Sequence, residues 1–166
     1  MDGTVGDVTG GDYVAAHLRE DLVEEPPPWP PHEIVPGLWQ SGSPEPGEHW
    51  DAVIDLHGSA PPLEDVEFYV HWLIEDGPAP AFTTLRSLAD LVDDLRADGK
   101  RVLIHCAAGI NRSGLLSAAA LIRGGHDPDE AIALVREART GALNNPNFVD
   151  LLHDPRWEPR ASRSSG

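Results

Sequence analysis

One stretch of the chain, RVLIHCAAGINRSGLLSAAALIRGG at residues 101–125, limits the fold more than any other. Its first part, residues 101–105, is a short apolar run, which predicts a central buried strand. A glycine-containing turn follows. The small and apolar residues after Arg112 then predict a tightly packed helix. The stretch therefore predicts a strand, a turn and a helix in direct succession.

The rest of the chain continues this alternation of strands and helices. Three more strands are predicted at residues 34–39, 52–56 and 69–74, each bounded by Gly, Pro or Asp. Leucine and valine recur at three- and four-residue spacing over 85–95, which predicts a helix with Thr83 as N-cap and Gly99 just beyond its end. Another helix begins at Asp127, with Pro128 in its first turn, and NNPNFVDLLHD predicts a short last one. This order defines an α/β fold.

The 166 residues are enough for one domain with a hydrophobic core. We expect residues 1–30 to form a flexible or partly helical extension, because YVAAHLREDLVEE can form a helix whereas the following prolines cannot. The domain itself is expected at 31–154. The polar residues 155–166 are expected to be a disordered tail.

The formal net charge of −16 repels nucleic acid and anionic membranes, so we expect neither as a partner. No apolar run approaches the roughly 20 residues that span a bilayer, and the acidic N-terminus does not resemble a secretory signal. We therefore expect a cytoplasmic protein. The single cysteine excludes an intrachain disulfide, and the eight histidines lack metal-ligand spacing, so no metal site is expected.

The lone Cys106 lies between the predicted strand and the turn, and Arg112 follows in a C-x5-R pattern. The small residues in between allow successive backbone N–H groups to turn inward and bind a tetrahedral oxyanion at a helix N-terminus. The same amides favour the thiolate of Cys106, a strong nucleophile. Arg112 can grip two phosphate oxygens. The predicted phosphate-binding residues are Ala107, Ala108, Gly109, Ile110, Asn111 and Arg112.

Two neighbours complete this predicted site. The hydroxyl of Ser113 can donate to the sulfur of Cys106 and so make it a better leaving group from a phosphocysteine intermediate. His105 is expected to support the loop by hydrogen bonding rather than to act as a base. A buried cysteine after a strand is often only a small apolar residue. Here, however, its spacing comes together with Gly109, Ser113 and the helix, which favours catalysis.

The segment HCAAGINRSG resembles the H-C-x-x-G-x-x-R-[ST]-G signature of the cysteine-dependent protein tyrosine phosphatase superfamily. IVPGLWQSG, VIDL and NNPNFVDLL are similar to segments of its dual-specificity branch, so the resemblance covers residues 32–153. It implies a central, mixed, mostly parallel sheet flanked by helices. It also implies hydrolysis in two steps through phosphocysteine, without metal or cofactor.

The resemblance also implies an aspartic acid on a separate loop that protonates the leaving oxygen. Asp76 matches this position, because it follows a predicted strand and precedes the helix at 85–95. A bound phosphate raises a carboxyl pKa by like-charge repulsion, which suits a general acid. Glu75 is the neighbouring alternative, and both acids could instead be solvated loop residues. Asp55 is expected to be structural.

The predicted substrate is a phosphoprotein, chiefly one with phosphotyrosine, and phosphoserine and phosphothreonine are the alternatives. The loop has no lysine, which disfavours phosphoinositides. Asn111 leaves alternatives open, because G-x-N-R is similar to the loop of RNA 5′-triphosphatases of the same superfamily. Small phosphate esters are a further alternative. A non-catalytic phosphate-binding adaptor and a rhodanese-like sulfurtransferase are the remaining ones.

Overall fold

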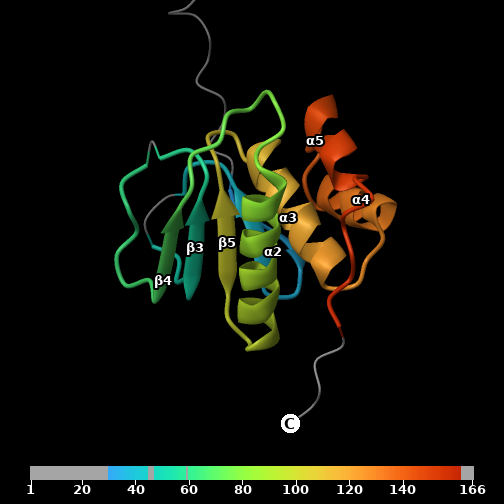
Figure 1. Cartoon of the computed structure of the whole chain (residues 1–166). Helices are drawn as coiled ribbons and strands as arrows, with labels where there is room; N and C mark the ends of the chain where they lie inside the picture. Colours follow the sequence, from blue (N-terminus) through green and yellow to red (C-terminus); the bar gives the residue numbers. More distant parts are fainter. Residues whose placement is uncertain (1–29, 45–46, 59, 162–166) are drawn as a thin grey trace, which may run out of the picture.

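The computed structural model describes residues 30–44, 47–58 and 60–161. The expected N-terminal helix and most of the proline-rich segment lie outside these residues. A five-stranded sheet with the order β1-β2-β5-β3-β4 forms the centre of the molecule (Figure 1). Its strands are β1 His32–Val35, β2 Leu38–Ser41, β3 Ala52–Asp55, β4 Phe68–His71 and β5 Val102–His105.

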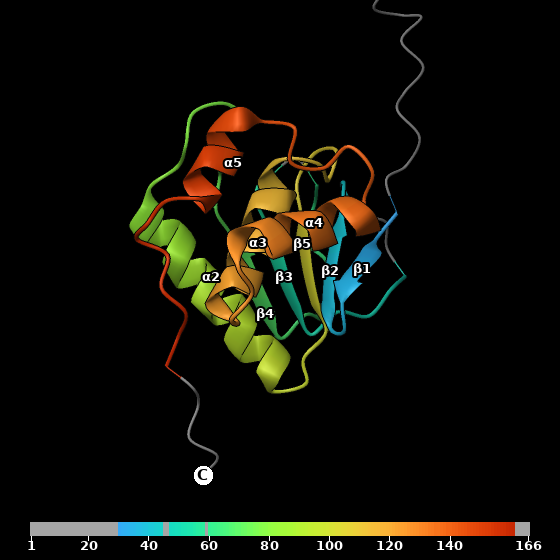
Figure 2. The same cartoon turned by 90° about the vertical axis from the view of Figure 1, so that its right-hand side faces the viewer.

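Only β1 is antiparallel to its neighbour; the other pairs are parallel. The helices are α2 Phe82–Ala97, α3 Arg112–Arg123, α4 Pro128–Ala138 and α5 Pro146–Leu152. They lie together against one face of the sheet, as Figures 1 and 2 show. The predicted fold class, a mixed and mostly parallel sheet flanked by helices, is confirmed.

The register of the sheet brings the ends of the parallel strands to one edge. His105 pairs with both Ser41 and Asp55, and Asp55 pairs with His71. The segments that follow these strands therefore leave the sheet side by side. Two of them are the Cys106 loop after β5 and the Asp76 loop after β4, so the topology itself brings the two predicted parts of the site to the same edge.

The side chains on the two faces of β3 and β5 belong to different hydrophobic clusters. Ala52, Ile54, Val102 and Ile104 face the helices and join the main core. Val53 and Leu103 point the other way and pack with Trp50 and, more loosely, Trp39. This alternation explains why both central strands read as continuous apolar runs, since each is buried on both faces.

The strand expected at residues 34–39 is wrong as a single element. Pro36 and Gly37 form a turn instead, with Gly37 at φ 84°, and split the segment into the antiparallel strands β1 and β2. The expected N-cap at Thr83 is also wrong. Helix α2 begins at Phe82, and its N-cap is Ala81, which forms no side-chain cap bond. Phe82 packs against Trp157 with ring centroids 4.7 Å apart.

Other helix boundaries agree with the sequence. Gly99 follows the end of α2 at φ 77°, the left-handed conformation that favours glycine. The side chain of Asp127 accepts a hydrogen bond from the backbone N–H of Glu130 at 3.0 Å, with Pro128 in the first turn of α4.

The expected disordered tail begins too early, since residues 155–161 pack on the domain. Trp157 is only 8% exposed, and its indole N–H donates to the carbonyl of Leu151 at 2.7 Å. Arg160 forms an ion pair with Asp94 at 2.6 Å. Burial of the Trp157 ring outweighs the polar composition of its neighbours.

Candidate active site

The loop between β5 and α3 begins at Cys106, which is 2% exposed. Gly109 is the tight point of this loop. Its φ is +66°, and a Cβ atom added there would lie 2.2 Å from the carbonyl carbon of Ser41. Both the backbone conformation and the close approach of the end of β2 therefore require glycine at this position.

Four successive carbonyl groups of the loop accept hydrogen bonds from outside it. The donors to residues 107, 108, 109 and 110 are, in that order, the Ser43 backbone, the Arg139 guanidinium, the Gln40 amide and the Leu143 backbone, at 3.0–3.3 Å. In a trans peptide the N–H points opposite to the carbonyl. The N–H groups of residues 108–111 therefore turn toward the inside of the loop, which is the geometry of an anion-binding nest.

Cys106 and Ser113 face one another across the start of α3. The Sγ atom of Cys106 lies 3.3 Å from the Oγ atom of Ser113, and both side chains are buried. Arg112, between the loop and the helix, is half-buried, and its Nη1 donates to the carbonyl of Ile74 at 3.3 Å. The guanidinium thus lies between the Cys106 loop and the segment that leads to Asp76.

Asp76 is exposed, but its carboxylate is held by two side-chain amides. Asn111 Nδ2 donates to Asp76 Oδ2 at 2.9 Å, and Asn145 Nδ2 donates to Asp76 Oδ1 at 2.8 Å. Asn145 also donates to the carbonyl of Gly77 at 3.1 Å. The structure thus joins Asp76 directly to the Cys106 loop. Glu75, the alternative acid, is exposed on the same loop.

His105 lies buried beneath the loop with Asp55, and their Nε2 and Oδ1 atoms are 3.7 Å apart. Burial lowers the pKa of His105, although Asp55 opposes this shift, so the imidazole is neutral near pH 7. Asp55 accepts hydrogen bonds from the backbone of His57 and Gly58 and from the Tyr69 hydroxyl. These bonds outweigh burial and lower the pKa of Asp55. Asp55 is therefore a structural residue, as expected.

Sequence reasoning missed Arg139, which follows α4 and is 2% exposed. Its guanidinium donates to the carbonyls of Ala108 and Pro30, at 3.0 and 2.9 Å, and lies 3.1 Å from His32 Nδ1. Burial lowers the pKa of Arg139, and the charge on Cys106 opposes that shift. Arg139 therefore supports the Cys106 loop through the carbonyl of Ala108 and places a positive charge next to it.

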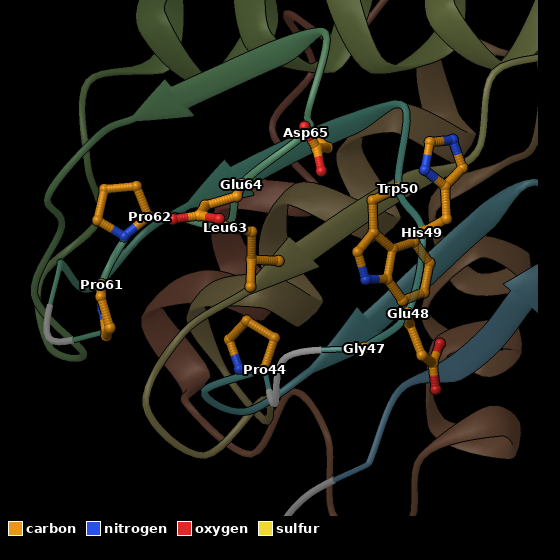
Figure 3. A pocket seen from close by; sticks show the side chains of 10 residues that line it. All are labelled: Pro44, Gly47, Glu48, His49, Trp50, Pro61, Pro62, Leu63, Glu64 and Asp65. Carbon is orange, nitrogen blue, oxygen red and sulfur yellow. The ribbon is translucent and has the colours of Figure 1, made fainter.

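A pocket of about 750 Å³ lies beside Trp50 and Leu63, and no residue of the Cys106 loop is among those that line it (Figure 3). Its lining includes three carboxylates, those of Glu48, Glu64 and Asp65. Such a lining repels a phosphate group. Within the described part of the chain, no three His, Cys, Asp or Glu side chains are grouped to hold a metal ion. The helices described there are too short or too polar to cross a membrane.

Residues 53–156 match the family described as dual specificity phosphatase, catalytic domain, and the chain belongs to this family. It is 37% identical to the human protein tyrosine phosphatase type IVA 3 over 93 residues, 54% of each chain. It is 32% identical to protein tyrosine phosphatase PRL-1 of Trypanosoma cruzi over 106 residues, 61% of this chain and 58% of that one. The chain thus spans little more than half the length of these relatives.

Solved structures agree with the family. The active form of Tk-PTP superposes with a TM-score of 0.64 at 28% identity, covering 74% of this chain and 93% of that one. A putative dual specificity phosphatase from mouse, in complex with zinc tungstate, gives a TM-score of 0.67 at 25% identity and covers 78% and 87%. The fold and the membership of the superfamily, both implied by the resemblance, are confirmed.

Proposed function

We propose that this protein is a phosphoprotein phosphatase that hydrolyses phosphotyrosine, and also phosphoserine and phosphothreonine, through a phosphocysteine intermediate. One observation carries the proposal. Cys106 begins a loop whose backbone N–H groups turn inward, and its Sγ atom lies 3.3 Å from the Oγ atom of Ser113. The relatives named protein tyrosine phosphatases support the same activity.

In the first step the inward N–H groups and Arg112 hold the phosphate oxygens. The thiolate of Cys106 attacks phosphorus in line with the leaving oxygen, so that the S–P bond forms as the P–O bond breaks. Asp76 donates its proton to the leaving oxygen, which departs as the neutral alcohol of the substrate side chain. Its place beside the loop suits this role.

In the second step water attacks the phosphocysteine. Asp76, now a carboxylate, takes a proton from this water, and the S–P bond breaks to release phosphate. The electron pair returns to sulfur, and the hydroxyl of Ser113 stabilises the thiolate by donating a hydrogen bond to it. Both steps leave Cys106 and Asp76 in their original protonation states.

The side chains of the loop support a simple phosphomonoester as the substrate. Ala107, Ala108 and Ile110 offer no charge to a second phosphate group. Asn111, which suggested an RNA 5′-triphosphatase, directs its side-chain amide to Asp76 and to residues 144–145. That resemblance therefore lends no support to an RNA substrate. The net charge of −16 opposes a polyanion as well.

We also infer that the phosphatase works in the cytoplasm on a phosphorylated protein. A nucleophilic thiolate stays active in a reducing compartment, and the lone Cys106 has no second cysteine for an intrachain disulfide. We further propose that the phosphatase domain begins at residue 31 and includes the packed residues 155–161 beyond the expected boundary at 154, with residues 1–30 as an extension to it.

Hydrolysis assays on four substrates test the proposal: an aryl phosphate, a phosphotyrosine peptide, a phosphoserine peptide and an RNA with a 5′-triphosphate. We expect the wild type to release phosphate from the aryl phosphate and from both phosphopeptides, fastest from the phosphotyrosine peptide, and Cys106→Ser to release none. Faster hydrolysis of the RNA would favour the triphosphatase. An inactive wild type that binds the phosphopeptide would favour an adaptor, and cyanide-dependent turnover of thiosulfate a sulfurtransferase.

A further inference from the structure

We propose that Asn111 is a positioning residue that holds the Asp76 loop against the phosphate-binding loop, and that it does not read the substrate. This inference rests on the proposed function, because it assigns a role to Asn111 in the proton transfer by Asp76. The backbone N–H of Asn111 remains part of the predicted phosphate-binding loop, and the proposal concerns its side chain alone.

The side chain of Asn111 uses every hydrogen-bonding position that an amide has. Its Oδ1 accepts from the backbone N–H groups of Asn144 and Asn145, at 2.8 and 3.1 Å. Its Nδ2 donates to Asp76 Oδ2 at 2.9 Å and to Asn144 Oδ1 at 2.7 Å. An amide has two donors and two acceptor positions, so none remains for a substrate.

The orientation of this amide follows from its partners. A backbone N–H can only donate, so the atom that faces residues 144 and 145 must be the oxygen. The nitrogen therefore faces Asp76. Asn111 is 9% exposed, and a buried amide with all its partners in place is held rigidly.

Three segments meet at this point although they are far apart in the sequence. They are the Asp76 loop, the end of the phosphate-binding loop and the start of α5, where Asn145 caps the helix and Asn147 donates to the carbonyl of Gly77 at 2.9 Å. Figure 2 shows the segment before α2 passing beside α5. Asn111 is the member that links this cluster to Arg112, its neighbour in the chain.

A neutral amide suits both steps of the proposed reaction. Asn111 can donate to one oxygen of Asp76 whether the other oxygen carries a proton or not. Asn111 therefore holds the carboxyl group of Asp76 at the same position relative to the bound phosphate, both when Asp76 donates its proton and when it takes one up. A serine or glycine at this position has a shorter reach and could not bridge the same three partners.

A leaving-group comparison tests this role. Phenyl phosphate has a poor leaving group that needs a proton from Asp76, whereas dinitrophenyl phosphate has a good one that does not. We expect Asn111→Ala to lower kcat/KM, which reports the first step alone, about tenfold for phenyl phosphate and less than about twofold for dinitrophenyl phosphate, because only the transfer of a proton to the leaving oxygen is misaligned. Asn147→Ala is the matched control. It removes a bond to the same loop without touching the carboxylate, and should leave the ratio of the two rates unchanged.

A second variant keeps the test valid if Asn111→Ala folds poorly. Asn111→Asp has the same shape and retains the acceptor for residues 144 and 145, but places a carboxylate beside Asp76. Two adjacent carboxylates bind a proton more tightly than one, so the alkaline limb of the kcat profile for phenyl phosphate should move to higher pH.

Equal loss on both substrates, or an unmoved pH profile in Asn111→Asp, would overturn the positioning role while leaving the phosphatase intact. Failure of the wild type to hydrolyse either substrate would overturn the proposed function, and this inference with it. The two failures are therefore distinguishable in one set of measurements.

Discussion

Ser113 Oγ lies 3.3 Å from Cys106 Sγ, and both side chains are buried. The pair bridges the phosphate-binding loop and the first turn of α3, so the hydroxyl has a fixed position relative to the sulfur. A hydroxyl at this distance can donate to a thiolate. Before attack this bond stabilises the nucleophile and so does not speed the first step, whereas in the second step it stabilises the leaving group and speeds release of phosphate.

Ser113→Ala should therefore slow release of phosphate from Cys106 more than its formation. We expect kcat to fall about ten- to hundredfold, the effect of removing one hydrogen bond to a charged group. Stopped-flow assays with an aryl phosphate should show a burst of alcohol followed by slow turnover. Ser117→Ala is the control, since Ser117 Oγ is buried on the same helix and no hydrogen-bond partner for it is found among the described residues. A Ser113→Ala enzyme without a burst would contradict this role.

Gly109→Ala should abolish activity in a protein that still folds. The added Cβ would lie 2.2 Å from the Ser41 backbone, so the loop must move. Its N–H groups then no longer point to one position. A displacement of this size lowers turnover by about 100-fold or more. Gly99→Ala is a matched control, because Gly99 has a similar φ of +77° but nothing within 4 Å of the added Cβ. It should cost about 1 kcal/mol of stability and leave kcat unchanged.

Asp76→Asn and Glu75→Gln separate the two candidate acids. Asp76 is fixed beside the loop by Asn111 and Asn145, so Asp76→Asn should lower kcat for phenyl phosphate about 100-fold and remove the alkaline limb of its pH profile. Glu75→Gln should change kcat less than about twofold, since Glu75 is not the residue that donates the proton to the leaving oxygen. The reverse order of effects would transfer the role of general acid to Glu75.

The stability of the domain should fall in mild acid because of His105. Burial lowers the pKa of this imidazole in the folded state, so the unfolded state binds more protons. The resulting contribution to stability is present above the unfolded pKa of about 6.5 and is lost as the pH falls below it. The midpoint of thermal unfolding, measured from about pH 8 to about pH 5, should drop less in His105→Asn than in the wild type.

His153 provides a control of opposite sign for this pH dependence. Its pKa is raised, mainly by a hydrogen bond to Asp129 at 2.7 Å. The stabilising contribution is present in mild acid and is lost as the pH rises through the folded pKa. It is small because both side chains are largely exposed. His153→Asn should therefore make the acid-induced drop slightly steeper, and a flatter profile would contradict the assignment.

The sequence predicted those features that local patterns encode. The Cys106 loop, the cap at Asp127 and the glycine at 99 each depend on residues a few positions apart, so their spacing sufficed. The hairpin at Pro36 and Gly37 was missed because the apolar residues on both sides were assigned to one strand, although a Pro-Gly pair between them is a turn signal. The burial of Trp157 depends on the core against which it packs. Its neighbours in the sequence are polar, so they did not indicate that this residue is buried.

The contacts of Arg139 and Asn111 could not be predicted, for the same physical reason. Arg139 bonds to residues 30, 32 and 108, and Asn111 to residues 76, 144 and 145. The partners of Arg139 come together only when the end of α4 meets the start of β1 and the loop after β5. Those of Asn111 come together only when the segments after β4 and β5 meet the start of α5. No periodicity within one segment contains that information. The side chain of an asparagine in a loop can bond to nearby backbone or to a distant segment, and the sequence alone does not show which.

Trapping of the phosphocysteine tests the central claim most directly. Ser113→Ala is mixed with an aryl phosphate, quenched in acid within the first turnover and digested, and the peptide that contains residue 106 is examined by mass spectrometry. The account predicts a phosphoryl group on Cys106, and none in a Cys106→Ser, Ser113→Ala double variant. Turnover without any phosphorylated peptide, or with the phosphoryl group on another residue, would contradict it.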